Sequence, residues 1–258
     1  MEQTVFILNV TFQIKNNTEI NKINKHYYSI LGFILNILEN KNEIYNNILS
    51  ISPIIKKYNT EDNYFIKISI LGENNFKFIT QIFLDNLNNI FTLDWIEFIL
   101  KQLDNNFKWL KLDELLYKEF NFNTFVINFK SPTFLKKTMK EKQINFYLPI
   151  PEEFIISAIR KYYKIYWVKI NDNTLILLKD KIKYNLFISQ FNIETKKIKV
   201  KWWIKAGVVW NVKYNLNIKN DFSLEEKNII YRSLILANFI GLWNWTKLWL
   251  WQVQIKFN

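Results

Sequence analysis

The 258-residue sequence contains no cysteine, one histidine, four glycines and four prolines. Without cysteine the chain has neither disulfides nor thiolate metal sites, and a single histidine argues against a zinc site. No run reaches the roughly 18 uncharged apolar residues of a membrane span. The N-terminal MEQTVFILNV lacks the pattern of a signal peptide. We therefore expect a cytoplasmic protein that uses no cofactor, binds no metal and has no membrane partner.

Asparagine and lysine dominate what is present, with 35 and 33 residues, and the net charge is +12. A sequence pI near 9.5 favours a polyanionic partner such as nucleic acid. Hydrophobic residues make up 49% of the chain, which is enough for one large domain or two smaller ones with cores of their own.

Tryptophan is unexpectedly common. Residues with AT-rich codons are abundant here, so tryptophan, with its G-rich codon, should be rare, yet there are 10 beside 4 glycines. Average glycine usage is about 7%. Our hypothesis is that these tryptophans are TGA codons that the source organism reads as glycine. In the alternative, the tryptophans are genuine and form a stacking face, since alternate residues of a strand share a side.

Two tryptophan clusters carry this hypothesis. Residues 241–251 read GLWNWTKLWLW and residues 201–210 read KWWIKAGVVW. With glycine at the tryptophan positions they become GLGNGTKLGLG and KGGIKAGVVG. Glycine permits positive φ and lets a backbone approach a phosphate chain closely, where successive N–H groups form an anion-binding nest.

The first half of the chain predicts the order strand, helix, strand, strand, helix, strand, which is that of a ferredoxin-like unit. The periodicities place these elements at Thr4–Ile14, Thr18–Leu38, Asp62–Leu71, Asn75–Thr80, Gln81–Ile90 and Phe91–Gln102.

A second unit follows a lysine-rich junction. We expect strands at Asn123–Lys130, Ile144–Leu148, Thr174–Leu178, Lys183–Phe191, Lys197–Lys201 and Asn211–Ile218. A helix should run from Glu152 to about Tyr166, with proline in its first turn, and another from an N-cap at Ser223 to Ile240. The predicted domains are residues 1–115 and 116–258, and the fold class is α+β.

The glycine-substituted 241–251 loop resembles the C-terminal glycine-rich motif of the RAMP superfamily, and more narrowly of the CRISPR-associated endoribonucleases that process precursor CRISPR RNA. FKSPTFL at Phe129–Leu135, the helix IPEEFIISAIRKYYKIY and LILANFIGL before the loop resemble further parts of that family. The resemblance implies two tandem ferredoxin-like domains with a C-terminal glycine-rich-type loop. It also implies metal-independent cleavage by the RNA 2′-hydroxyl, which leaves a 2′,3′-cyclic phosphate and a 5′-hydroxyl.

Two of the three catalytic residues that are usual in this family are replaced by other residues here. The usual tyrosine falls on Leu35, and the usual Leu-His pair falls on Leu49-Ser50. The family's downstream lysine falls on Lys56 or Lys57. As catalytic residues we expect His26 and Tyr28, as substitutes for the missing pair, together with Lys56. Histidine has an unperturbed pKa near neutrality, which suits a general acid or base. His26 as an ordinary helix-packing residue is the competing interpretation.

The RNA-binding residues that we expect lie in and beside the two clusters. Lys205 and Lys247 are the favoured lysines because glycines would open their loops to a phosphate. The full expected set is Lys205, Gly207, Gly241, Trp243, Asn244, Trp245, Thr246, Lys247 and Trp249.

The sequence therefore predicts a RAMP-type endoribonuclease that binds and cuts CRISPR repeat RNA. Further partner hypotheses are a CRISPR effector complex and a homodimer. A catalytically inactive RNA-binding subunit of such a complex is the first alternative. A tryptophan-rich β protein that binds carbohydrate or membrane through aromatic faces is the second.

Overall fold

The structure is a computed structural model in which the chain divides into two compact units, one formed mostly by residues 1–114 and one mostly by residues 115–258. It describes residues 3–15, 48–52, 55–56, 63–93, 96–104, 108–120, 122–129, 135–139, 142–146, 150–200, 203–216, 222–242 and 253–258. The helix expected at Thr18–Leu38 lies outside these residues.

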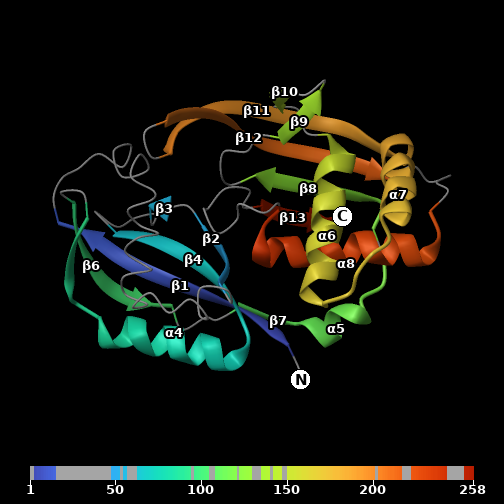
Figure 1. Cartoon of the computed structure of the whole chain (residues 1–258). Helices are drawn as coiled ribbons and strands as arrows, with labels where there is room; N and C mark the ends of the chain where they lie inside the picture. The colour runs from blue at the N-terminus through green and yellow to red at the C-terminus, as the bar shows by residue number, and fades with distance from the viewer. Residues whose placement is uncertain are drawn as a thin grey trace. The chain divides into compact units, whose positions relative to one another are not determined.

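The first unit is built on an antiparallel sheet around β1 (Thr4–Ile14) (Figure 1). Its strand order is β2-β4-β1-β6-β5, where β2 is Ile48–Ile51, β4 is Asn63–Leu71, β5 is Ile90–Leu93 and β6 is Ile96–Leu103. β6 pairs with the second half of β1, and β7 (Lys108–Lys111) pairs with the first half along the same side. The two-residue β3 (Ile55–Lys56) pairs with β4.

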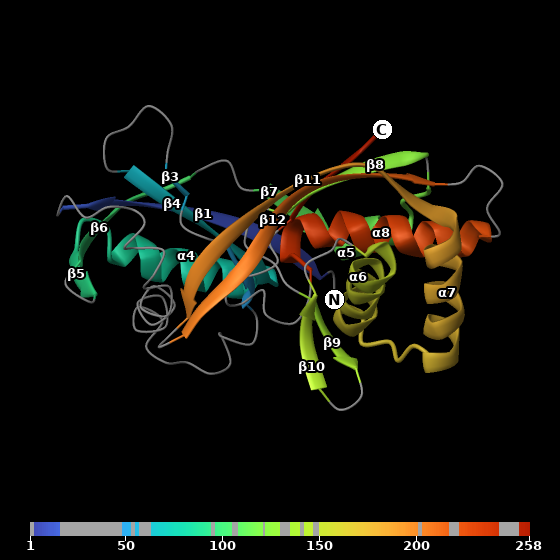
Figure 2. The same cartoon turned by 90° about the horizontal axis from the view of Figure 1, so that it is seen from above.

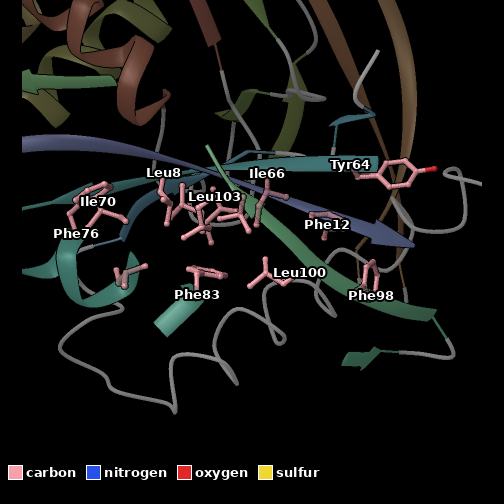
Figure 3. Packing of buried hydrophobic residues seen from close by; sticks show 14 of the residues in the cluster. Leu8, Phe12, Tyr64, Ile66, Ile70, Phe76, Phe83, Phe98, Leu100 and Leu103 are labelled. Carbon is pink, nitrogen blue, oxygen red and sulfur yellow. The ribbon is translucent and has the colours of Figure 1, made fainter. Parts of the chain in front are cut away.

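Helix α4 (Glu73–Asp85) covers one face of this sheet with Phe76, Ile79 and Phe83, which recur at helical spacing. These side chains pack with Leu8, Ile66, Leu100 and other apolar residues of β1, β4 and β6 in one core (Figure 3). The strand predicted at Asn75–Thr80 is therefore wrong. The alternation in Phe76-Lys-Phe78 resembles a strand, but only the spacing of Phe76, Ile79 and Phe83 buries all three on the sheet.

The second unit has a four-stranded sheet in the order β11-β12-β8-β13. These strands are β8 (Thr124–Phe129), β11 (Leu186–Val200), β12 (Trp203–Leu216) and β13 (Val253–Phe257). Both neighbours of β8 run antiparallel to it. With one helix between β8 and β11 and another between β12 and β13, this is the ferredoxin-like arrangement. The predicted α+β class with two tandem ferredoxin-like domains is confirmed.

Three longer helices belong to the second unit: α6 (Pro151–Ile165), α7 (Asp172–Asn185) and α8 (Leu224–Ile240). Phe154 of α6 packs on Phe129 and Tyr214, so α6 lies on one face of the sheet, and α8 lies on the same side (Figure 2). The predicted N-cap at Ser223 is confirmed, and Glu226 completes a capping box with it at the start of α8. A short helix α5 (Leu112–Leu116) and a hairpin of β9 (Leu135–Met139) and β10 (Lys142–Phe146) complete the elements.

Helix α7 corrects two predictions. The strand predicted at Thr174–Leu178 is helical, and the one predicted at Lys183–Phe191 begins only at Leu186. The run Leu175–Leu178 is continuously apolar, but Ile176 and Leu177 are exposed, whereas Leu175, Leu178 and Ile182 are buried. The Asn171 side chain accepts the Asn173 N–H and caps the helix.

The end of α6 places a tryptophan in a backbone conformation that favours glycine. Trp167 has φ 57° and is 84% exposed. Its N–H donates to the Lys164 carbonyl oxygen, and the Val168 N–H donates to that of Tyr163. This pair of hydrogen bonds is the Schellman motif, whose left-handed position is usually glycine. The finding agrees with our hypothesis that tryptophan stands at glycine positions.

None of the helices in the described part of the chain is long and apolar enough to cross a membrane.

Candidate nucleic-acid interface

The expected glycine-rich loop begins at Gly241, which caps the C-terminus of α8. Its φ of 69° and ψ of −179° lie in a region that is essentially restricted to glycine. The Gly241 N–H donates to the Ala237 carbonyl oxygen at 2.8 Å, and the following Leu242 is fully buried. The first residue of the loop is therefore fixed by the helix end. Trp243, Asn244, Trp245, Thr246, Lys247 and Trp249 lie outside the described residues.

Lys161 of α6, which the sequence analysis did not single out, lies next to the C-terminus of α8. Its Nζ donates to the carbonyl oxygens of Ile240 at 3.4 Å and Gly241 at 3.3 Å. The last carbonyls of a helix lack intrahelical partners, and a cation is favoured there. Burial lowers the pKa of Lys161 well below its usual value, and the nearby Lys164 lowers it further. The charged and the neutral amine can both donate these hydrogen bonds.

Lys205 and Gly207 lie within strand β12. The prediction that Lys205 belongs to an open loop is therefore wrong, because the strand begins at Trp203 rather than near Asn211. Trp210, further along the strand, is 2% exposed and meets Phe129 edge to face at 4.8 Å. Its Nε1 is buried without a hydrogen-bond partner in the structure. An unpartnered buried donor costs free energy, so this position also suits a smaller residue.

Of the three catalytic candidates, Lys56 belongs to the described residues. His26 and Tyr28 lie outside the described residues, as do Leu35 and Lys57. Lys56 lies on β3, opposite Tyr64. Ser50, at the position of the family's usual histidine, is 1% exposed and donates its hydroxyl to Ser69 Oγ at 3.0 Å. A buried hydroxyl in such a pair has no titratable group to offer.

A second lysine that sequence reasoning missed stands on β4 beside this serine pair. The Lys67 N–H donates to Ser52 Oγ at 2.8 Å, and the Ser52 N–H donates to the Lys67 carbonyl oxygen at 2.7 Å. Burial, together with the charge of Lys108 on β7, lowers the pKa of Lys67 from 10.5 to about 8. Two lysines close enough to repel each other favour a bound anion such as phosphate. The alternation of NYFIKISIL indicated which face carries Lys67, but not that Lys108 lies near it.

Among the residues that the structure describes, no group of three or more His, Asp or Glu side chains could hold a metal ion.

No family model matches the chain, and a search of curated proteins finds no match. Solved structures do match along nearly its whole length. A Cas6 product complex has a TM-score of 0.76 at 14% identity, and the match covers 99% of this chain and 100% of that one. Cas6 of Thermus thermophilus, with the same identity and coverage, has a TM-score of 0.72. A Cas6-related protein from Pyrococcus furiosus has a TM-score of 0.59, again at 14% identity, over 98% of each chain. The chain therefore has the fold of Cas6 and RAMP proteins.

Proposed function

We propose that this protein binds CRISPR repeat RNA and cuts it during maturation of precursor CRISPR RNA. The observation that carries the proposal is the match of both ferredoxin-like units, over 99% of the chain, to a Cas6 in complex with its product. The net charge of +12 and the loop that begins at Gly241 agree with a phosphate-rich ligand.

The proposed reaction needs no metal. The 2′-oxygen attacks the adjacent phosphorus while a base takes its proton, and the bond from phosphorus to the 5′-oxygen breaks as an acid protonates that oxygen. The products are a 2′,3′-cyclic phosphate and a 5′-hydroxyl. We assign the proton transfers to His26 and Tyr28, and stabilisation of the negative charge on the phosphorane to Lys56.

Lys67 and Lys108 add to this proposal. A phosphate near the two lysines would reduce the repulsion between their ammonium groups. Lys67 lies on β4, next to the segment that contains Ser50 and Ser52. An RNA backbone near this lysine pair would lie on the first unit, whose strand β3 carries the catalytic candidate Lys56.

One observation favours a second candidate, an RNA-binding subunit that does not cut. The position of the usual histidine is occupied by Ser50, which is buried and bonded to Ser69. A protein that has lost this histidine without a substitute would still hold processed RNA, for example within a CRISPR effector complex. A homodimer would suit either candidate.

The deciding experiment incubates the protein with the repeat RNA of its own genome in EDTA. We expect cleavage at one position within the repeat and products with a cyclic phosphate and a 5′-hydroxyl. Tight repeat binding without cleavage would select the inactive subunit. No binding to any repeat of the source genome would contradict both candidates.

A further inference from the structure

Within the described part of the chain, helices cover one face of the sheet of the second unit and leave the other face open. Trp210, Val212 and Tyr214 of β12 are buried, as are Phe125, Ile127 and Phe129 of β8. They face α6 and α8, which lie on one side of this sheet (Figure 2). Successive side chains of a strand point to opposite faces. The residues between these six, which are less buried, therefore form the open face.

Strand register arranges the open face in rows across β12, β8 and β13. Val126 pairs with Lys213 on one side and Lys256 on the other, which gives a row with two lysines. Asn128 pairs in the same way with Asn211 and Gln254, so the neighbouring row consists of three amide side chains.

Strand β11 adds two exposed aromatic rings. Ser189 donates its hydroxyl to the side chain of Asn215 at 3.2 Å, and Asn215 belongs to the open face because it alternates with buried Tyr214. Phe187 and Phe191 lie two residues either side of Ser189 and share its face. They are 51% and 58% exposed.

The charge of the open face has one sign. The strands β8, β12 and β13 contain no aspartate or glutamate, and Glu194 of β11 falls on the opposite alternation from Phe187 and Phe191. Lys213 and Lys256 are therefore the charged groups among the positions described above. An anionic ligand is favoured on this face.

We propose that this open face, centred on Phe187, Phe191 and the Lys213–Val126–Lys256 row, binds a single-stranded segment of RNA. Bases stack on the two phenylalanine rings, the amide row offers donors and acceptors to base edges, and the lysines contact phosphates. The site adds a base-contacting surface to the proposed function and rests on it for the RNA in question. A docked protein is less suited, because the centre of the face is cationic and polar rather than apolar.

The test compares the full chain with a Phe187→Ala, Phe191→Ala double variant, using fluorescently labelled oligouridylate and, separately, repeat RNA. Stacking on an aromatic side chain contributes enough that its loss should weaken binding roughly tenfold for each ring. Tyr184→Ala is the matched control, since this ring on α7 is 67% exposed and outside the sheet. It should bind as the parent does. The exposure of Phe187 and Phe191 predicts an unchanged melting temperature for the double variant.

A second variant tests the lysine row without touching the aromatic rings. Lys256→Gln should lower the slope of log affinity against log salt by about one, whereas Lys183→Gln on α7 should leave it unchanged. Oligouridylate binding that depends on the rings, in a protein that binds no repeat RNA, would keep this inference and contradict the proposed function. Tight repeat binding that is equal in the double variant and the parent would overturn the inference alone. So would a double variant whose RNA affinity is unchanged and whose oligomeric mass is lowered, because the face would then be a protein interface.

Discussion

The Lys161 side chain donates to the carbonyl oxygen of Gly241 over 3.3 Å, which links helix α6 to the residue where α8 ends. The same amine also reaches the Ile240 carbonyl oxygen. The end of α8 is thus held in part by a side chain 79 residues before Ile240 and 80 residues before Gly241 in sequence.

We expect Lys161→Met to lower the free energy of unfolding by about 1–3 kcal/mol, because two buried carbonyls lose their donor. Methionine keeps most of the apolar stem, so lost packing contributes little. Lys164→Met, an exposed neighbour on the same helix, is the control and should change stability by less than about 0.5 kcal/mol. Denaturant unfolding measures both. Equal stability of Lys161→Met and the parent would show that water replaces the amine.

Trp167→Gly should stabilise the second unit by about 1 kcal/mol, because Trp167 has positive φ, which costs most non-glycine residues free energy. Its exposed ring contributes little buried area. Trp167→Ala retains the Cβ and hence the backbone penalty, so it should give no gain. The denaturant midpoints of the glycine and alanine variants, each compared with that of the parent, measure the two changes in stability. A gain in the alanine variant as large as in the glycine variant would contradict the backbone explanation.

The hypothesis that TGA is read as glycine predicts glycine at positions 167 and 210 of the protein purified from its source. Peptide mass spectrometry distinguishes glycine from tryptophan directly. Removing a genuine buried tryptophan should cost about 3–5 kcal/mol. A source protein that carries glycine at position 210 and is folded would support the hypothesis, because a glycine that replaced a genuine core tryptophan would destabilise the second unit. TGG codons at the ten positions would end it.

The pKa of Lys67 predicts a rise in stability with alkaline pH. Its folded pKa of about 8 lies below the unfolded value near 10.5, so between these values the unfolded chain binds more protons. Unfolding free energy then increases with pH, by about 1–3 kcal/mol over that range. Lys67→Met should remove this rise and should be more stable than the parent at pH 7. Lys108, whose charge contributes to the lowered pKa of Lys67, is unchanged in this variant. Parallel pH profiles for parent and variant would refute this account.

His26→Ala tests the chemistry of the proposed function. If His26 transfers a proton in the transition state, cleavage of repeat RNA should slow by about 10²–10⁴-fold while RNA affinity stays nearly constant. Single-turnover cleavage and equilibrium binding separate the two quantities. Full activity would return His26 to a packing role and leave Tyr28 and Lys56 as the catalytic candidates.

The fold was predictable where sequence signals were local and unambiguous. Ser223 indicated the N-cap of α8, and Pro151 indicated the first turn of α6. The failures fell on helices whose sequences resemble strands. In α7 the run Leu175–Leu178 is apolar without interruption, and only tertiary packing on α6 decides which of its side chains are buried.

The candidate site was less accessible to sequence reasoning. Gly241 could be chosen from its motif, because glycine at a helix end is a local signal. Lys161 and Lys67 could not, because their importance arises from partners on other elements: the end of α8 for Lys161, Ser52 and Lys108 for Lys67. A lysine within an amphipathic helix or strand looks like a solvated residue until its neighbours are known.

The pairing of β13 with β8 has a consequence for synthesis. Val253–Phe257 lies beside Phe125–Phe129, so the second sheet cannot be completed until residue 257 has left the ribosome. Every strand of the first sheet precedes residue 112. Domains generally fold as units during translation, the N-terminal one first. The first unit can therefore form its sheet before β8 has either of its partners. A nascent chain stalled between residues 216 and 253 would leave one edge of β8 with unpaired backbone N–H and C=O groups, to which another strand could pair.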